Sequence, residues 1–489
     1  NRRIMPSDRI IGRTYEQAII KRCLENEEAQ LIALYGRRRV GKTFLIKEYF
    51  NDQFDFVFTG MFEASRDVLL LQFQKRIEAF YGKPCKRLHN WFDAFDMLSE
   101  YLDTLDKERI VVFLDELPWM DTPRSNFLQA FTLWWNEWGS RKQHLKLFVC
   151  GSSTSWMMSN LIGDKGGLYG RVSRSIYLSP FNLGETEQFL KQSKGIELSR
   201  YQILEAYMIL GGIPYYLNML EKGVPLSVNI DNLFFKQGAP LRSEFNFLFR
   251  SLFKESKIYY SIVRALAKHR KGMTRQEILA AIGAKEGGAL TEALTNLLQC
   301  DFLRKFTAIG KKERDALYQL TDLFSLFHIK FVGENSGQDQ HFWTNIMGQG
   351  GKMEWCGYAF EQVCLHHIQQ IKDALSISGV LSNVHSWSCK AFTDKDGNQW
   401  SGAQIDLLID RSDNVINFCE MKFSNTEYGI SADYEEKLRN RVAVFKAITK
   451  TRKAIQHTFV TTYGVRHNLH SAIVQSEVTM DDLFKFPSA

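Results

Sequence analysis

The chain has 489 residues and a mass of 56.7 kDa, which is too much for one hydrophobic core and predicts three or four domains. Hydrophobic residues make up 45%, and no apolar run is long enough to span a membrane, so we expect a cytoplasmic protein without a membrane span or a secretory signal. The eight scattered cysteines form no C-x-x-C pair, which indicates a reducing compartment and argues against zinc, and the net charge of +7 permits nucleic-acid binding without requiring it.

The first motif is a glycine-containing loop between a predicted strand and a predicted helix. The apolar run Leu31–Tyr35 predicts a buried strand, residues 36–43 (GRRRVGKT) fit the pattern G-x-x-x-x-G-K-[ST], and Phe44–Phe50 has helical spacing. Such a loop turns its backbone N–H groups toward a phosphate at the positive end of the helix. We expect ATP to bind here, with Lys42 on the β- and γ-phosphates and Thr43 on Mg²⁺. The other loop residues expected around the phosphates are Gly36, Arg37, Arg38, Arg39, Val40 and Gly41.

The elements around this loop follow the alternation of a parallel α/β sheet. Helical spacing over Arg9–Ile20 predicts a helix ahead of the loop, and one interpretation of its Arg13 and Glu16 is a capped surface helix on the sheet. After the loop, Phe54–Thr59 predicts a second strand, and helices are predicted over residues 67–80 and 90–105.

An acidic pair ends the next predicted strand. Five apolar residues after Arg109 lead to Asp115 and Glu116, so both carboxylates are expected at the carboxyl edge of the sheet, where open α/β sheets bind ligands. We expect Asp115 to hold Mg²⁺ through its water shell and Glu116 to act as the general base that polarises the attacking water.

Two further segments complete the predicted nucleotide site. Lys146–Cys150 predicts a buried strand followed by Ser152, which we expect to sense the γ-phosphate, to belong to a Ser/Thr-rich helix cap, or both. The stretch 164–180 predicts a buried strand near its end, preceded by Arg171 and Arg174. Arg171 is the preferred candidate for an arginine finger, and a solvated charge is the alternative.

Helical patterns replace the α/β pattern from residue 182 to about 230, with a break at Gly211–Pro214. Three helices over 259–268, 274–282 and 290–300 and two strands over 302–306 and 316–320 then resemble a winged helix-turn-helix. The third helix holds no Lys or Arg, so phosphate contacts are expected from the hairpin, and a purely architectural winged helix is the alternative. The basic hairpin residues are Arg304, Lys305, Lys311, Lys312 and Arg314. The Gly-, Gln- and Asn-rich stretch 331–353 predicts a linker.

The C-terminal part combines a predicted helix over 355–375, which carries Glu361, with strands over 384–392, 404–409 and 415–423. On adjacent strands Asp406 and Glu420 can share a metal ion, and Lys422 on the same face as Glu420 can orient or deprotonate the attacking water. Charged groups in such apolar strands are costly unless they pair or bind metal. The alternative is a structural salt bridge between Glu420 and Lys422.

Together these motifs resemble a known family, the archaeal-type P-loop ATPases of the AAA/STAND lineage that carry a restriction-endonuclease-like C-terminal domain. The resemblance covers nearly the whole chain. It rests on 11–16 (IGRTYE), 36–43, 115–116 (DE), 168–171 (LYGR), 211–215 (GGIPY), 357–361 (GYAFE), 405–406 (ID), 420–423 (EMKF), 461–464 (TTYG) and 482–484 (DLF). It implies an α/β protein with a P-loop ATPase core at 1–180, a helical lid at 181–245, a winged helix at 246–335 and a PD-(D/E)-x-K nuclease-like domain at 350–489. In that pattern Glu361, Asp406, Glu420 and Lys422 match the nuclease positions, and Gln404 departs from it, since many relatives carry an acidic residue or arginine there.

The resulting hypothesis is an ATP-dependent nuclease of defence or mobile-element type. ATP hydrolysis would switch the winged helix and license cleavage at a site that uses Mg²⁺ or Mn²⁺. DNA is the expected substrate, RNA stays open, and the resemblance allows a homo-oligomer. The main alternative is a STAND-like switch that binds ATP tightly and uses its C-terminal domain only to bind nucleic acid or a partner. A winged-helix regulator on a P-loop scaffold is the third alternative.

Overall fold

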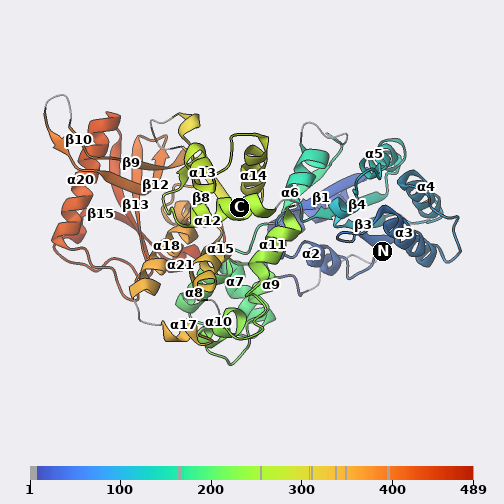
Figure 1. The fold of residues 1–489 in the computed structure, drawn as a ribbon, viewed down its shortest axis with the longest axis horizontal. Helices are drawn as coiled ribbons and strands as arrows, with labels where there is room; N and C mark the ends of the chain where they lie inside the picture. The colour runs from blue at the N-terminus through green and yellow to red at the C-terminus, as the bar shows by residue number, and fades with distance from the viewer. Residues whose placement is uncertain are drawn as a thin grey trace. The chain divides into compact units, whose positions relative to one another are not determined.

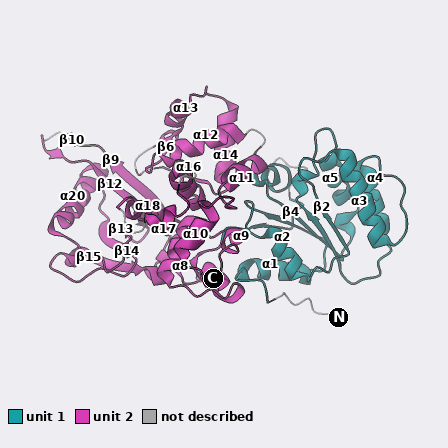
Figure 2. Cartoon of the chain, turned by 60° about the horizontal axis from the view of Figure 1, so that its bottom comes forward, with its two compact units in different colours: residues 1–180 teal, residues 181–489 magenta. Residues whose placement is uncertain are grey.

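The computed structural model describes residues 8–163, 168, 170–253, 256–307, 309, 312–335, 339–346, 350–393 and 397–487 (Figure 1). The chain divides into two compact units, Asn1–Pro180 and Phe181–Ala489, which Figure 2 shows in separate colours. Within these described ranges, no helix has both the length and the apolar character that crossing a membrane requires.

The first unit is built on a five-stranded parallel sheet with the strand order β2-β3-β4-β1-β5. Its strands are β1 (Gln30–Tyr35), β2 (Phe56–Thr59), β3 (Ile110–Asp115), β4 (Leu145–Gly151) and β5 (Arg174–Tyr177). Because every strand runs in the same direction, the carboxyl ends of β1, β3 and β4 meet at one edge. The predicted parallel α/β sheet is confirmed.

Helices cover both faces of this sheet. The helices are α1 (Thr14–Glu25), α2 (Lys42–Tyr49), α3 (Arg66–Tyr81), α4 (Trp91–Leu102), α5 (Phe127–Glu137) and the short α6 (Thr154–Met157). On one face, α3, α4 and α5 enclose an aromatic cluster in which Phe73, Trp91 and Phe127 are fully buried. On the other face, Phe50 after α2 packs edge-on against Phe148 of β4. Alternate residues of the strands therefore reach separate cores.

Two predicted elements of this unit differ in the structure. The first helix begins at Thr14 rather than at Arg9, because Gly12 and Arg13 both adopt left-handed backbone angles that cannot continue a helix. The strand expected to be buried before Pro180 is instead the edge strand β5, which pairs only with β1 and buries only Ile176. Arg174 is the first residue of that strand and is exposed.

The second unit begins with a helical block. It contains α7 (Leu183–Gln188), α8 (Arg200–Leu210), α9 (Pro214–Leu217), α10 (Leu226–Phe234), α11 (Glu244–Leu252), α15 (Leu323–Phe327), α16 (Gly333–Asn335) and α17 (Phe342–Asn345). Gly211 and Gly212 separate α8 from α9 with positive φ angles, and a Cβ on Gly212 would lie 2.2 Å from the Phe181 carbonyl oxygen. The predicted break therefore needs glycine for both conformation and space.

The stretch predicted as a linker belongs to this helical block. Residues 336–338 and 347–349 lie outside the described part of the chain, but α17 between them is anchored by the buried Asp231. Asp231 accepts hydrogen bonds from the backbone N–H of Trp343 at 2.8 Å and from the Thr344 hydroxyl at 2.6 Å. Trp343 is fully buried against Phe327 and other aromatic rings. The linker prediction is wrong for this segment. The polar residues suggested a linker, but Trp343 among them is buried against aromatic rings of the helical block.

Three helices and a small antiparallel sheet follow. The helices are α12 (Ser256–Ala267), α13 (Arg275–Ile282) and α14 (Gly288–Gln299), and the strands β6 (Met273–Thr274), β7 (Leu303–Phe306) and β8 (Leu317–Leu320) pair in the order β6-β8-β7. The side chain of Thr274 caps α13 together with Glu277. We call this group the three-helix module. Lys311, one of the basic hairpin residues, lies outside the described residues.

The C-terminal part is a mixed five-stranded sheet with the order β15-β14-β13-β12-β9. Its strands are β9 (Ser382–Cys389), β12 (Ala403–Arg411), β13 (Val415–Lys422), β14 (Ala454–Thr461) and β15 (Val474–Thr479), and its helices are α18 (Gly350–His366), α19 (Ile368–Ala374), α20 (Ala432–Thr449) and α21 (Met480–Leu483). Strands β9, β12 and β13 are antiparallel neighbours, whereas β13, β14 and β15 are parallel. Phe418 of β13 packs against Phe445 of α20. We call this part the C-terminal module.

Candidate functional site

The phosphate loop connects the end of β1 to the start of α2. Gly36 adopts φ +139°, and a Cβ there would lie 2.5 Å from the Leu178 carbonyl oxygen, so only glycine fits. Gly41 is the N-cap of α2 with φ +92°. The two glycines of the motif thus set the turn, and α2 begins at Lys42 with its N-terminal N–H groups at the loop.

Two basic side chains fix the loop from inside the unit. Lys42 is buried, and its Nζ donates to the carbonyl oxygens of Gly36 and Arg37, both at 2.9 Å. Arg13 is also buried, and it donates to the carbonyl oxygens of Val40 and Ser179. Arg13 is therefore an internal support of the loop rather than part of a surface cap, a role that its sequence position does not reveal.

The predicted magnesium pair lies together at the carboxyl edge of the sheet. The Thr43 hydroxyl is 3.0 Å from both carboxylate oxygens of Asp115, which is buried at the end of β3. The buried Cys150 thiol donates to the same carboxylate, and burial raises the pKa of this thiol, which therefore stays protonated. A hydroxyl and a carboxylate are the hard oxygen ligands that Mg²⁺ takes beside phosphate groups. These two residues fit a magnesium ion bound with ATP.

Glu116, the predicted general base, is oriented by Ser152. The Glu116 Oε2 atom accepts hydrogen bonds from the Ser152 hydroxyl at 2.8 Å and from the Ser152 backbone N–H at 3.1 Å. Ser152 is buried at the tip of β4. The structure thus places its hydroxyl on the base. The helix that follows has Ser153 at its N-cap, without a side-chain capping bond.

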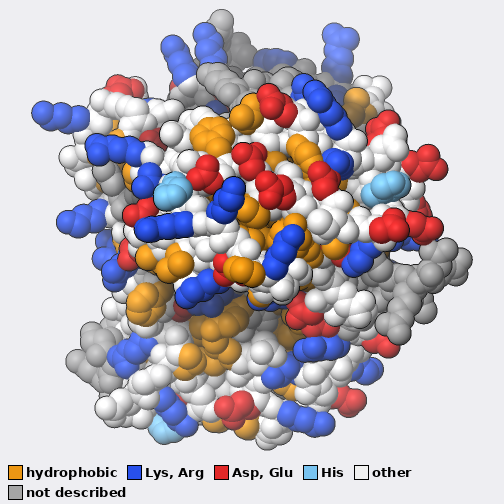
Figure 3. Space-filling view, turned by 90° about the vertical axis from the view of Figure 1, so that its right-hand side faces the viewer, with side chains coloured by type: hydrophobic (Ala, Val, Ile, Leu, Met, Phe, Trp, Pro, Cys, Tyr) orange, Lys and Arg blue, Asp and Glu red, His pale blue; other side chains and the backbone are white. Residues whose placement is uncertain are grey.

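The arginines near the loop differ in their surroundings. The Arg38 guanidinium lies over the Trp119 ring at 5.3 Å, which connects the loop to the segment after Glu116. Arg171 is exposed and forms no side-chain hydrogen bond or ion pair with the described residues, and its motif neighbour Tyr169 lies outside them. The finger role of Arg171 stays a prediction. On the face shown in Figure 3, Lys and Arg side chains alternate with Asp and Glu side chains instead of forming one basic patch.

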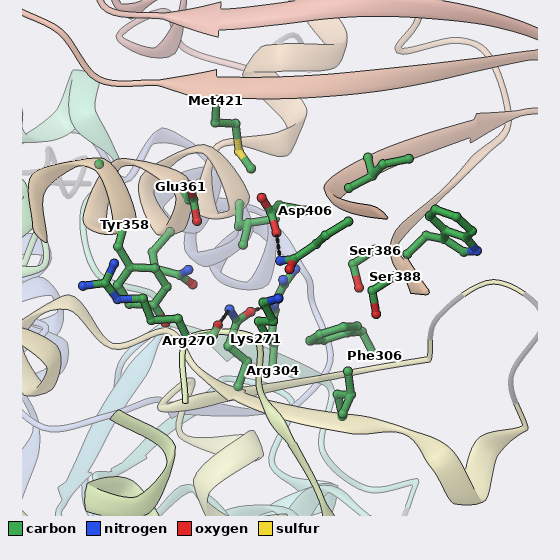
Figure 4. Close-up of a pocket in the computed structure, with 18 of the residues that line it drawn as sticks. Arg270, Lys271, Arg304, Phe306, Tyr358, Glu361, Ser386, Ser388, Asp406 and Met421 are labelled. Carbon is green, nitrogen blue, oxygen red and sulfur yellow. Dashed lines mark hydrogen bonds between the residues drawn. The ribbon is translucent and has the colours of Figure 1, made fainter. Parts of the chain in front are cut away.

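A second candidate site is a pocket of about 320 Å³ in the second unit. Glu361 of α18 and Asp406 of β12 line it together with Met421 of β13, and the three-helix module lines the opposite side (Figure 4). Asp406 accepts a hydrogen bond from the Gln404 amide. The residue at which the sequence departs from the family pattern thus supplies a neutral partner for Asp406.

The carboxyl group of Glu361 has a raised pKa in this pocket. Burial, followed by the negative charge of Asp406, raises the pKa of Glu361 to about 8. Lys422 and Arg270 act in the opposite direction, and Glu420 adds to the rise. The Glu361 side chain is therefore mainly protonated at neutral pH.

Glu420 and Lys422 lie on the other face of the sheet, against α20. Glu420 is buried and accepts hydrogen bonds from Arg441 and from the Tyr434 hydroxyl, both at 2.6 Å, while Lys422 lies 3.8 Å from it. Burial alone would raise the pKa of Glu420, but Arg441 and Lys422 outweigh it and hold the pKa below its usual range. Glu420 is thus an ionised group held by cations.

The predicted metal site shared by Asp406 and Glu420 is not assembled here. In the part of the chain that the structure describes, no three His, Cys, Asp or Glu side chains are grouped closely enough to hold a metal ion. The physical reason lies in β12, whose register against β9 shifts between Ile405 and Leu408. Such a bulge reverses which side chains face each side of a strand, so Asp406 faces the pocket with Glu361.

Sequence reasoning missed the two partners of Glu420. Tyr434 and Arg441 are seven residues apart on α20, which is two helical turns, so they share the face that packs on β13. The spacing of Tyr434 and Arg441 could have indicated that they share a helix face, but nothing in the sequence shows that this face packs against Glu420.

We predict that Glu361→Gln stabilises the protein at about pH 9 by up to about 4 kcal/mol and has no effect below about pH 4. Because the folded pKa is raised, the folded state keeps the proton longer than the unfolded chain, so the wild type loses stability as the pH rises from its usual carboxyl range to about 8. Thermal unfolding midpoints across this range measure the difference. Glu354→Gln, an exposed carboxyl on the same helix, is the matched control. A variant that is no more stable than wild type at high pH would contradict the assignment.

Comparison with known proteins agrees with the geometry of the nucleotide site. Residues 11–220 match the family model described as an ATPase domain predominantly from Archaea. This part of the chain is thus similar to an ATPase domain and has the parallel sheet and phosphate loop of a P-loop fold. It contains the phosphate loop, the Thr43–Asp115 pair and the Glu116–Ser152 pair.

Three further matches cover a larger share of the chain. An uncharacterized protein of Methanocaldococcus jannaschii is 24% identical over 424 residues, which cover 85% of this chain and 88% of that protein. Among solved structures, the Walker-type ATPase of Pyrococcus abyssi matches with 19% identity and a TM-score of 0.47, over 68% of this chain and 99% of its own. The Aeropyrum pernix ORC2 protein, in its ADPNP–ADP complexes, matches with 15% identity and a TM-score of 0.40, over 68% and 95%.

Proposed function

We propose that this protein hydrolyses ATP and that hydrolysis controls a C-terminal module that acts on DNA. The observation that carries the first half is the Thr43 hydroxyl at 3.0 Å from the Asp115 carboxylate, directly beside Glu116 and at the mouth of the phosphate loop. Phosphate-binding backbone, magnesium ligands and a base thus converge at one sheet edge, which is the arrangement needed for phosphoryl transfer to water.

In this reaction, the oxygen of a water molecule forms a bond to the γ-phosphorus, and the bond from that phosphorus to the oxygen of ADP breaks. Glu116 accepts the proton of the water, and Ser152 keeps the carboxylate in position through two hydrogen bonds. Lys42 neutralises charge on the β- and γ-phosphates. Thr43 and Asp115 would hold Mg²⁺, which supplies further charge neutralisation of the phosphates when bound.

The second half of the proposal concerns cleavage of DNA at the C-terminal module. It is supported by the carboxyl groups of Glu361 and Asp406 in one pocket and by the charged pair Glu420 and Lys422 on the next strand. Glu361 would have to lose its proton before it and Asp406 could offer carboxylate oxygens to Mg²⁺ or Mn²⁺. The fit is incomplete, because Glu420 is engaged with α20.

One experiment tests both halves. Supercoiled and linear DNA are incubated with Mg²⁺ or Mn²⁺, with and without ATP, while phosphate release is followed in the same samples. We expect ATP-dependent cleavage by the wild type and its loss in Asp406→Ala, with phosphate release unchanged in the variant. The proposed nuclease activity is wrong if the wild type does not cleave DNA or if the variant cleaves it equally well. The proposed ATPase activity is wrong if no phosphate is released.

A second function, an ATP-dependent switch, is favoured by the two hydrogen-bonded glutamates. Glu116 is engaged with Ser152, and Glu420 is engaged with Arg441 and Tyr434, which are arrangements that a slow or non-cleaving protein would also use. In this case the protein would bind ATP tightly, turn over slowly, and bind nucleic acid or a partner without cleaving it. The switch is supported if ATP turnover is slow, if ATP causes oligomerisation, and if the activity of the C-terminal module does not depend on a metal ion.

A further inference from the structure

The pocket at Glu361 and Asp406 has a basic wall. The three-helix module supplies Arg270 and Lys271 just before β6 and Arg304 from β7. Figure 4 shows these side chains on one side of the pocket and the two carboxyl groups on the other. The pocket therefore contains three cations that the nuclease-like pattern does not include.

Arg304 is held in place by an uncharged amide and an aromatic ring. Its Nε donates to the Gln319 side chain at 2.6 Å, and its guanidinium lies 4.4 Å from the centre of the Phe306 ring. Among the described residues, its terminal nitrogens form no hydrogen bond or ion pair. Burial lowers the pKa of Arg304 to about 10, so the group is still a cation at neutral pH. A half-buried guanidinium of this kind is suited to an incoming anion, above all a phosphate.

Gln319 links this arginine to the neighbouring one. Besides accepting from Arg304, the buried Gln319 donates to the backbone carbonyl of Arg270. The Arg270 side chain pairs with Glu354 at 3.0 Å and lies over the Tyr358 ring. Lys271 is exposed and forms no ion pair within the described ranges. The basic wall is therefore preorganised by one amide, with Lys271 available to a ligand.

The rest of the lining offers a polar atom without a partner. Gln362 is 1% exposed, and its side-chain oxygen has no hydrogen-bond partner within the described part of the chain. A buried polar atom of this kind needs an explanation, and a bound ligand is one. Apolar side chains of Phe306 and Leu317 complete the wall. A volume of about 320 Å³ lies at the lower end of small-ligand pockets and suits a single nucleotide.

We propose that this pocket binds one nucleotide of a single nucleic-acid strand, with its phosphate on Arg304 and Lys271. The inference rests on the proposed action of the C-terminal module on nucleic acid and names the form of the substrate. A base held in such a pocket must be unpaired and unstacked, so a single strand binds in preference to a duplex. Aromatic side chains such as Phe306 accept the face of any base, so little sequence preference is expected.

The test measures strand binding without catalysis. The full chain is saturated with ADP, EDTA is added, and fluorescence anisotropy follows a short single strand or a hairpin duplex. We expect the single strand to bind more tightly than the duplex, Arg304→Gln to weaken strand binding about tenfold, and Lys271→Ala to weaken it about threefold. Arg452→Gln is the matched control, because this exposed arginine lies just before β14 in the C-terminal module and does not line the pocket. Equal losses in the Arg304 and Arg452 variants, or equal binding of the duplex, would overturn the proposal.

A replacement variant and a competitor complete the experiment. If Arg304→Gln unfolds, Arg304→Lys, which keeps the charge, and Lys271→Ala take its place. Free dCMP as a competitor distinguishes a strand from a mononucleotide, and displacement of the strand by dCMP at the affinity of the strand itself would overturn the strand assignment. The result is separable from the proposed cleavage. Arg304-dependent binding without any cleavage by the wild type supports the pocket alone, whereas cleavage with unchanged binding in Arg304→Gln supports the nuclease alone.

Discussion

Replacing Glu116 with glutamine is expected to lower the rate of ATP hydrolysis by about 10²- to 10⁴-fold while ATP binding stays nearly unchanged. Glutamine has the size of glutamate and its side-chain oxygen can still accept the two hydrogen bonds from Ser152, but it cannot take the proton of the attacking water. The loss therefore falls on the chemical step. Phosphate release under single-turnover conditions measures the rate, and titration with a fluorescent ATP analogue measures binding.

Two further variants locate this effect at the base. Glu108→Gln changes an exposed carboxyl group just ahead of the opposite end of β3 and should leave hydrolysis unchanged. Ser152→Ala removes the 2.8 Å hydrogen bond to Glu116 but keeps the backbone one, so its loss should stay within about tenfold. Wild-type hydrolysis by Glu116→Gln would show that another group accepts the proton.

The nucleotide site could be predicted from the sequence because its parts are local or are strand ends. The loop at 36–43 carries its own geometry in two glycines, and Asp115 and Ser152 each follow a buried apolar run. In a parallel sheet such ends must meet at one edge, so pattern and topology together bring them into one site. What the sequence could not show is the contact between Ser152 and Glu116, since it depends on the left-handed backbone of Glu116, with φ 48°.

The C-terminal site was less predictable, because a shift of one residue in strand register determines which face of the sheet Asp406 lies on. In a regular antiparallel pair, Asp406 and Glu420 would stand side by side on one face, as their places next to the paired residues Leu407 and Cys419 indicate. The register shift between Ile405 and Leu408 separates them instead. No residue in that stretch is a glycine or proline that would have marked a bulge. The contribution of Arg304 was equally hidden, because it comes from a module about a hundred residues earlier in the chain.

Removing Arg441 tests how firmly Glu420 is held against α20. Arg441→Ala should lower the local stability of β13 and α20 by about 2–3 kcal/mol, somewhat less than the cost of breaking a fully buried ion pair, since Tyr434 and Lys422 remain and Arg441 is partly exposed. Hydrogen exchange of the amides in β13 and α20, measured in the full chain, reports this local stability. Arg439→Ala, which removes the pair between the exposed Arg439 and Glu435 on the same helix, should cost much less.

The pH dependence of this loss separates an ion pair from simple packing. Because the pKa of Glu420 is held below its usual range in the folded protein, the ionised carboxylate contributes stability above its unfolded pKa of about 4.3, and that contribution disappears as the pH falls through the folded pKa. The difference between Arg441→Ala and wild type should therefore shrink in acid and should also shrink when Glu420→Gln is added. A loss that is equal at neutral and acid pH would mean that Arg441 stabilises β13 and α20 by packing and not as the ionic partner of Glu420.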